Sequence, residues 1–313
     1  MTPSRNRIAI IGRNGQVSRA LQKVLCSEYD LTTIGRPDAD LCEPQSVKAA
    51  ILAAQPDAVI NPAAYTAVDN AEDEPALAQS VNVVGAQSVA EAAAQIGAPI
   101  IHFSTDYVFD GRKTTPYLEV DAPNPLSVYG HTKLEGERCV ARANPRHIIL
   151  RTAWVYSATG SNFLRTMLRL ANERPSVRVV DDQYGTPTLA DDLAGTVRRI
   201  LSRLEADPEQ RDLYGVFHAT GGGATSWFHF AQAIMDGAGK RGAPHIPVHP
   251  IKAKDYPVKA ARPAYSVLSS QKLKTAYGIE LPDWQSALTR CLDQCVGQSN
   301  GNPTREDRGG ATQ

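Results

Sequence analysis

A tyrosine and a lysine four residues apart are the first candidates for chemistry in this sequence. Tyr129 and Lys133 lie in a segment, 128–143, whose pattern predicts a helix, so their side chains project from one face. A free phenol has a pKa near ~10, poorly matched to proton transfer at neutral pH. A neighbouring ammonium favours the phenolate and is expected to lower the pKa of Tyr129. The pair suits protonation of a carbonyl oxygen during its reduction, although chance also places such pairs on exposed helices.

The composition excludes several other classes of protein. The chain has 313 residues, with 33 Lys+Arg and 33 Asp+Glu, so no excess of positive charge attracts nucleic acid or anionic lipid. No apolar run is long enough to span a bilayer, and no secretory signal is recognisable. The 5 cysteines form no C-x-x-C motif, and the 7 histidines show no paired ligand spacing. We expect a reduced, cytoplasmic protein without a catalytic metal.

The N-terminal segment has the pattern of a dinucleotide-binding motif. A short apolar run, 7–11, leads into a turn with Gly12 and Gly15 and then a helical pattern through Leu25. Glycine allows close backbone approach to a pyrophosphate, and the helix N-terminus directs free N–H groups at it. Ser18 stands where a third glycine is usual, and a small residue can serve there. An ordinary strand-to-helix turn is the alternative interpretation.

The end of the second expected strand, 31–34, bears on the choice of cofactor. An acidic residue at this point binds the ribose hydroxyls of NADH, whereas an arginine suits the ribose phosphate of NADPH. Arg36 therefore favours NADPH, with NADH possible, and a solvated loop arginine is the alternative.

The elements that must position these residues follow in a regular order. Apolar strands are expected at 58–61, 99–105 and 146–152, alternating with helices such as 44–54 and 75–94. This alternation predicts an α/β protein with a doubly wound parallel sheet. Hydroxyls at the end of the fourth core strand, at Ser104 and Thr105, would face the Tyr129 helix and hold a ketone oxygen in line with the phenol; a polar strand terminus is the alternative. The long loop 110–125 is expected to form a wall or lid.

Several longer motifs occur together and in a fixed order. They are Gly12-x-x-Gly15-Gln16-Val17, residues 61–69 (NPAAYTAVD), 104–109 (STDYVF), Tyr129-Gly-x-Thr-Lys133, 151–156 (RTAWVY), Asn162-Phe163, 182–187 (DQYGTP) and Arg262-Pro263. Over about residues 7–296 the sequence resembles the dTDP-4-dehydrorhamnose reductases, a branch of the extended short-chain dehydrogenase/reductases with a Rossmann-like fold. The glycine loop and the Tyr-x-x-x-Lys pair are shared by the whole superfamily, while 151–156 and 182–187 are typical of this branch.

The resemblance implies a role for individual residues. Tyr129 would donate the proton, Lys133 would assist it and reach the nicotinamide ribose, and Thr105 would orient the substrate. Together with Tyr129 and Lys133, the cofactor would contact Gly12, Gly15, Gln16, Val17, Arg36, Asp40, Leu41, Ala63, Ala64, Tyr65, Thr66 and Phe103. The sugar nucleotide would contact Thr105, Asp106, Tyr107, Trp154, Asn162, Phe163, Gln183 and Arg262. Some family members hold magnesium at a dimer contact through glutamates, but the matching positions here are Ala20, Asp191 and Gln294.

The expected organisation is an NADP-binding domain, 1–154 and 187–220, and a nucleotide-sugar region, 155–186 and 221–296. Residues 297–313 are expected to be a disordered tail. The implied reaction is NADPH-dependent reduction of the 4-keto group of dTDP-4-dehydro-β-L-rhamnose, a dTDP-4-dehydro-6-deoxy-sugar, by a monomer or weak homodimer. The alternatives are reduction to a dTDP-6-deoxy-L-talose, an epimerase or dehydratase on the same frame, and a non-catalytic NADP-binding regulatory subunit. A single carboxylate after Thr105 disfavours the dehydratase, and the presence of Tyr129 and Lys133 disfavours the regulator.

Overall fold

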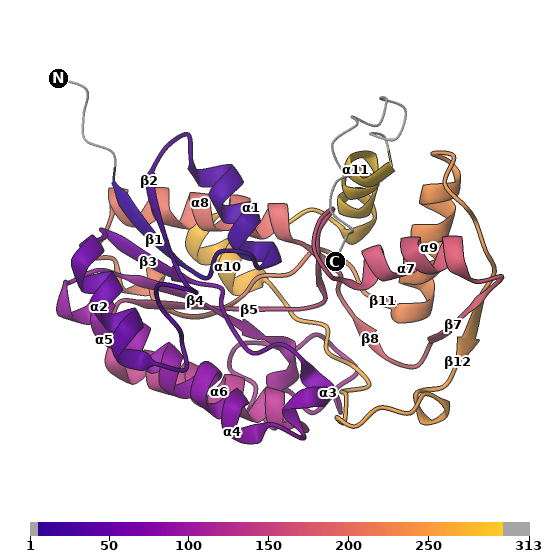
Figure 1. Cartoon of the computed structure of the whole chain (residues 1–313), viewed down its shortest axis with the longest axis horizontal. Helices are drawn as coiled ribbons and strands as arrows, with labels where there is room; N and C mark the ends of the chain where they lie inside the picture. Colours follow the sequence, from indigo (N-terminus) through magenta and orange to yellow (C-terminus); the bar gives the residue numbers. More distant parts are fainter. Residues whose placement is uncertain (1–5, 297–313) are drawn as a thin grey trace, which may run out of the picture.

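A parallel sheet of six strands organises the molecule (Figure 1), and the computed structural model describes residues 6–296. The strand order is β2-β1-β3-β4-β5-β10, with all neighbours parallel. Strands β3 and β4 are buried at every residue, as expected for apolar runs covered on both faces. The predicted doubly wound α/β fold is confirmed. The strands are β1 (Arg7–Ile11), β2 (Asp30–Ile34), β3 (Ala58–Asn61), β4 (Ile100–Thr105), β5 (His147–Thr152) and β10 (Gly215–His218).

Helices cover both faces of this sheet. One layer packs α1 (Gln16–Leu25) against α8 (Ala190–Ala206), with α10 (Gln271–Tyr277) beside them. The other layer contains α2 (Pro44–Ala54), α5 (Ala86–Gln95) and α6 (Val128–Ala143). The helices predicted at 44–54 and 128–143 are confirmed residue for residue.

The single helix expected at 75–94 is wrong in detail. The structure has α4 (Pro75–Gln79), a π-helical turn (Ser80–Gly85) and then α5. Within this turn Gly85 lies so close to Leu41 that an added Cβ would be 2.7 Å from the Leu41 carbonyl oxygen. The side chain of Asn82 binds the backbone of Tyr65, so the turn is anchored to the loop after β3. A π-helical turn often marks a functional region.

A smaller region stands beyond the carboxyl ends of the strands, at the right of Figure 1. Its separate apolar core contains Phe230, Met235 and Trp284. Helix α10 and the residues that follow it to Leu281 pack with the sheet instead, so the C-terminal segment expected as 221–296 is divided between the two cores. The expected tail, 297–313, lies outside the described residues. The region comprises β6 (Val155–Tyr156), α7 (Phe163–Glu173), β7 (Val177–Val180), β8 (Tyr184–Gly185), β9 (Thr188–Leu189), β11 (Thr225–Ser226), α9 (Trp227–Gly239), β12 (Val248–Ile251) and α11 (Trp284–Val296).

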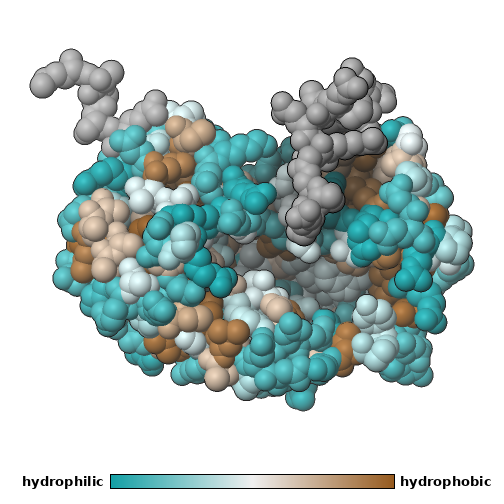
Figure 2. Space-filling model, viewed as in Figure 1, coloured by the Kyte–Doolittle hydropathy of each residue, from teal (hydrophilic) through white to brown (hydrophobic). Residues whose placement is uncertain are grey.

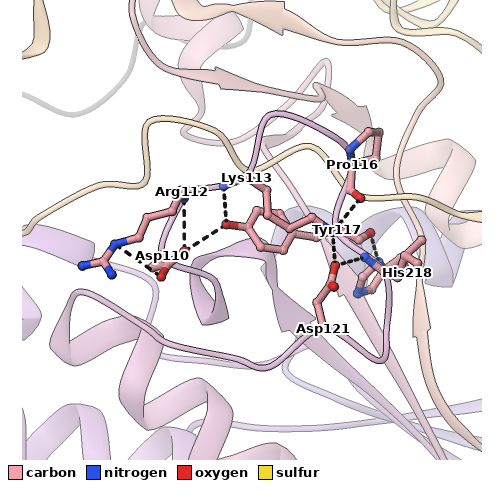
Figure 3. Close-up of polar contacts among 8 residues, drawn as sticks. Asp110, Arg112, Lys113, Pro116, Tyr117, Asp121 and His218 are labelled. Atoms are coloured by element: carbon pink, nitrogen blue, oxygen red, sulfur yellow. Dashed lines mark hydrogen bonds and ion pairs between the residues drawn. The ribbon is translucent and has the colours of Figure 1, made fainter.

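The loop after β4 packs against the end of β10 (Figure 3). Tyr117 stacks on Phe109 with centroids 4.2 Å apart, and its hydroxyl donates to Asp110 Oδ1 at 3.0 Å. The Tyr117 N–H donates to the Val267 carbonyl at 2.8 Å, and its carbonyl lies 3.2 Å from His218 Nδ1 at the end of β10. Residues 110–125 therefore pack against β10 and the segment 263–269 rather than lining the cavity described below. The wall or lid expected from this loop is wrong.

No helix among residues 6–296 has the length and apolar character needed to cross a membrane.

Candidate active site

A cavity of about 840 Å³ opens at the carboxyl ends of the strands, between the sheet and the smaller region. Figure 2 shows the molecule hollowed between its two halves. Strand β1 lies between β2 and β3, so the connections that follow β1 and β2 lead to opposite sides of β1 in the sheet. Ligands of parallel α/β sheets bind at such topological switch points. Most of the residues singled out in the sequence line this cavity: Gly12, Gly15, Gln16, Val17, Arg36, Asp40, Leu41, Ala63, Ala64, Tyr65, Thr66, Phe103, Thr105, Asp106, Tyr107, Tyr129, Lys133, Trp154 and Asn162.

The glycine turn after β1 fits a bound pyrophosphate. Gly12 has φ +91°, and a Cβ added to it would lie 3.2 Å from the Ala63 Cβ. A Cβ on Gly35 would lie 3.3 Å from the Gly12 Cα, so three backbone segments meet closely there. Helix α1 begins without a capping side chain and without an acidic residue in its first turn. Its first N–H groups therefore remain available for an anion.

Two arginines, rather than one, line the cavity directly after β1 and β2. The side chain of Arg36 is 83% exposed, and its Nε lies 3.8 Å from Asp40 Oδ2, so this surface ion pair is weak. Arg13 pairs with Asp38, while its buried Nε has no hydrogen-bond partner among the described residues. Arg13 was not singled out in the sequence, although its place directly after Gly12 was a usable signal. The two guanidinium groups fit the phosphate that distinguishes NADPH from NADH.

Tyr129 and Lys133 extend from α6 into the opposite end of the cavity. The Ser127 hydroxyl caps this helix by accepting from the Gly130 N–H at 3.2 Å. A Cβ on Gly130 would lie 2.3 Å from the Tyr107 carbonyl oxygen, so α6 packs closely on the 3-10 turn Asp106–Val108. Tyr129 is therefore held beside Thr105, whose hydrogen bond favours its phenolate form.

The protonation of the pair differs from the sequence-based expectation. Burial raises the pKa of Tyr129 to about 12, with the Thr105 hydrogen bond acting in the opposite direction. Burial also lowers the pKa of Lys133 to about 8; the lysine is 2% exposed and its Nζ donates to the Phe103 carbonyl at 2.7 Å. The expected lowering of the Tyr129 pKa by Lys133 is wrong, because desolvation dominates in both groups.

Asp106 is a buried carboxyl with an unused oxygen. Its Oδ1 accepts from the Thr105 hydroxyl at 3.0 Å, and Thr105 in turn accepts from the Tyr107 N–H at 3.2 Å. Asp106 Oδ2 has no hydrogen-bond partner among the described residues. Burial raises the pKa of Asp106 to about 6. Asp106 lines the cavity, but its Oδ2 atom is itself enclosed, and a hydrogen bond from the Ser266 side chain favours the charged form of the carboxyl.

A buried ion pair joins α6 to strand β5 one helical turn beyond Lys133. Glu137 receives two hydrogen bonds from Arg151 of β5, at 2.9 and 2.7 Å, and one from the Ser104 hydroxyl at 2.5 Å. Both charged side chains are 4% exposed. The charge of Glu137 favours the ammonium form of Lys133. Glu137 was not singled out in the sequence, although it lies one turn beyond Lys133 in the same i,i+4 series.

The substrate end of the cavity is less well anticipated by the sequence. Phe163, Gln183 and Arg262 do not line it. Phe163 packs on Trp227, with ring centroids 4.6 Å apart. Arg262 donates to Asp69 Oδ2 at 2.7 Å, and its Nη1 is buried without a partner among the described residues.

Two further residues at the cavity were missed. Trp227 lines it directly. Asn82 holds the wall formed by Ala64 and Tyr65, because its Oδ1 accepts from the Tyr65 N–H at 2.8 Å. Nothing in the local pattern marks Trp227, whereas a polar residue on the buried face of the 75–94 helix was a signal for Asn82.

The described residues contain no group of three His, Cys, Asp or Glu side chains suited to a metal ion. Asp191, at one of the positions discussed for magnesium, instead pairs with Lys23 at 2.9 Å.

A glycine turn at the switch point, arginines directly after β1 and β2, and a cluster of Tyr129, Lys133 and Thr105 in the same cavity define a class of protein. The molecule is a dinucleotide-dependent oxidoreductase of the extended short-chain dehydrogenase/reductase type.

Comparison with known proteins identifies the branch. Residues 6–296 match the family model described as the RmlD substrate binding domain. The dTDP-4-dehydrorhamnose reductase of Sinorhizobium fredii is 47% identical over 286 residues, which cover 91% of this chain and 96% of that protein. This chain belongs to the dTDP-4-dehydrorhamnose reductase family.

Solved structures agree with this assignment. A dTDP-4-dehydrorhamnose reductase from Clostridium acetobutylicum superposes with a TM-score of 0.85 at 38% identity, covering 92% of this chain and 98% of that one. The Bacillus anthracis enzyme, solved in complex with NADP, has a TM-score of 0.85 at 35% identity with the same coverage.

Proposed function

We propose that this protein reduces the 4-keto group of dTDP-4-dehydro-β-L-rhamnose to give dTDP-L-rhamnose, with NADPH as cofactor and NADH as a weaker substitute. The names of its relatives support the substrate, and the NADP complex of the Bacillus anthracis enzyme supports the cofactor. The observation that carries the proposal is the meeting of Tyr129, Lys133 and Thr105 in the cavity that also contains the glycine turn.

NADPH, when bound, supplies the hydride for C4 of the sugar. Tyr129 then gives its proton to the oxygen on C4. Its pKa of about 12 keeps the phenol protonated at neutral pH, which is the state an acid requires. Thr105 orients the ketone oxygen toward the phenol. The ammonium of Lys133 stabilises the phenolate that remains, and its own pKa of about 8 leaves it mostly charged at pH 7.

The sugar nucleotide would occupy the other end of the cavity. We assign Asp106 and the Trp154 ring to the sugar, because both line the cavity. Tyr107 and Asn162 line it as well and complete the contacts there. Phe163, Gln183 and Arg262 do not line the cavity in this structure, and their contacts with the sugar nucleotide stay predictions from the family resemblance.

The organisation of the chain is part of the same proposal. Residues 1–154 and 187–220 would bind NADP, and 155–186 and 221–296 would bind the sugar nucleotide, except for the part of the latter segment, 271–281, that packs on the sheet. The segment of α10 is placed with the first group because it packs on the sheet. A cytoplasmic monomer or weak homodimer that binds no nucleic acid remains our prediction.

The test is a product assay with both nicotinamide cofactors. The protein is incubated with NADPH or NADH and the 4-keto sugar nucleotide, and the loss of nicotinamide absorbance is followed. Tyr129→Phe is the matched control, since it removes only the acidic hydroxyl. NMR of the product distinguishes dTDP-L-rhamnose from the 6-deoxy-talose isomer. Absence of cofactor oxidation would refute the proposal and favour a regulatory subunit.

A further inference from the structure

The backbone of Trp154 is in a conformation that a bulky side chain rarely adopts. Its φ is +48°, in the left-handed region, and it follows strand β5 after only one intervening residue. Such a conformation is costly and persists only where the surroundings hold it. The Trp154 carbonyl accepts a hydrogen bond from the Thr188 N–H at 3.2 Å, and the indole lines the cavity.

Trp227 is the principal contact of that indole. The two rings stack almost in parallel, with centroids 3.5 Å apart and an interplanar angle of 8°. Trp227 is the first residue of α9, and its position is fixed by the Ser226 cap, which accepts from the His229 N–H at 3.2 Å. The Ser226 hydroxyl also donates to Asp181 Oδ1 at 2.6 Å, so the start of this helix is tied to the segment after β7.

Gly185 holds the same indole from another element. Strand β8, which contains Gly185, pairs with β11 immediately before Trp227. A Cβ added to Gly185 would lie 2.5 Å from Trp154 Cε2 and 2.7 Å from Nε1. Any side chain at position 185 would therefore displace the ring or the strand.

We propose that Trp227 and Gly185 are positioning residues that hold the Trp154 indole as an aromatic wall against the sugar ring of the substrate. The inference rests on the proposed function. Thr152, two residues before Trp154, is paired in register with Thr105, so the wall stands next to the point where the ketone would lie. A fixed aromatic face contacts a sugar ring without the cost of ordering a mobile side chain. The wall therefore acts on the sugar and not on the nucleotide.

The experiment compares the intact wild-type protein with Trp227→Ala, Trp227→Phe and Gly185→Ala. For Trp227→Ala and Gly185→Ala we expect kcat/KM for the 4-keto sugar nucleotide to fall at least ~10-fold. The inhibition constant of dTDP, which lacks the sugar ring, and the Kd of NADPH should stay within about twofold of wild type. Trp227→Phe retains a flat ring and should restore most of the lost kcat/KM.

Phe217→Leu is the matched control. Phe217 is a fully buried aromatic residue of β10 whose ring lies 5.4 Å from that of Tyr277, and it does not line the cavity. This variant should keep the wild-type kcat/KM.

Three outcomes would overturn the inference: an unchanged kcat/KM in Trp227→Ala, an equal loss of dTDP binding, or an equal effect of Phe217→Leu. If Trp227→Ala does not fold, Gly185→Ala decides between the same results. A wild-type protein that does not oxidise NADPH would refute the proposed function instead, so the two failures are distinguishable.

Discussion

Replacing Asp106 with asparagine is expected to make the protein more stable at neutral pH. The carboxyl is 2% exposed, and burial raises its pKa from 3.8 to about 6. Because the pKa of Asp106 is higher in the folded protein than in the unfolded chain, folding favours the neutral acid. The stability that the neutral acid contributes is lost as the pH rises through about 6. The difference between a pKa of 3.8 in the unfolded chain and about 6 in the folded protein lowers the free energy of unfolding by about 3 kcal/mol at pH 7.5. At pH 4.5 it lowers it by about 1 kcal/mol. Asparagine has the same shape and keeps an oxygen for the Thr105 hydroxyl, so it avoids this cost.

The assay is urea unfolding of wild type and Asp106→Asn between pH 4.5 and 7.5, followed by tryptophan fluorescence. The difference in unfolding free energy should grow in favour of the variant by about 2 kcal/mol over this range. Asp110→Asn is the matched control. Hydrogen bonds from Asn124 and the Arg112 backbone lower the pKa of Asp110 below 3.8, so its stabilising contribution is almost complete at pH 4.5, and the stability difference for this variant should stay nearly constant between pH 4.5 and 7.5. A stability difference for Asp106→Asn that does not change with pH would refute the reasoning.

Four further predictions concern the reaction and its cofactor. Tyr129→Phe should lower kcat by about 10²–10⁴-fold with the Kd of NADPH nearly unchanged, and a variant with substantial activity would remove Tyr129 from the acid role. Lys133→Met should lower kcat and weaken NADPH binding, measured by fluorescence titration, whereas unchanged affinity would contradict the ribose contact. In the wild type, kcat should fall above pH about 8 as Lys133 loses its proton. Arg36→Ala should weaken NADPH more than NADH, and Arg13→Ala should do the same; equal effects on the two cofactors would exclude the phosphate contact.

The elements of this fold were predictable where the signal is local. Apolar runs bounded by Gly and Pro located β1, β3 and β4, and the helix 128–143 carries its own Ser127 cap. The cofactor end of the cavity was also predictable, because its residues directly follow the strands that position them. At the substrate end, residues that follow β4 and β5 closely, such as Thr105, Asp106 and Trp154, line the cavity. Phe163 and Arg262 are held instead by contacts distant in sequence, with Trp227 and Asp69, which no local pattern indicates.

The directions of the pKa shifts at the site could not be predicted from the sequence either. The i,i+4 spacing of Tyr129 and Lys133 says which groups are neighbours, but the sign of each pKa shift depends on how far burial removes water from them. Only the packed structure contains that information, and it reverses the shift expected for the phenol.

The reversed order of the two pKa values suits a reductase. An enzyme that oxidises an alcohol needs a phenolate as base before the reaction, and a raised pKa would oppose it. A reductase needs the proton on the phenol first and a stabilised phenolate afterwards. Burial meets the first need, with a Tyr129 pKa of about 12, and the Lys133 ammonium meets the second. Burial also lowers the pKa of Lys133, which disfavours the ammonium, and the buried carboxylate of Glu137 acts in the opposite direction. The Glu137 carboxylate, remote from the ketone, therefore contributes to chemistry by favouring the charged form of Lys133, and Arg151 holds that carboxylate in place.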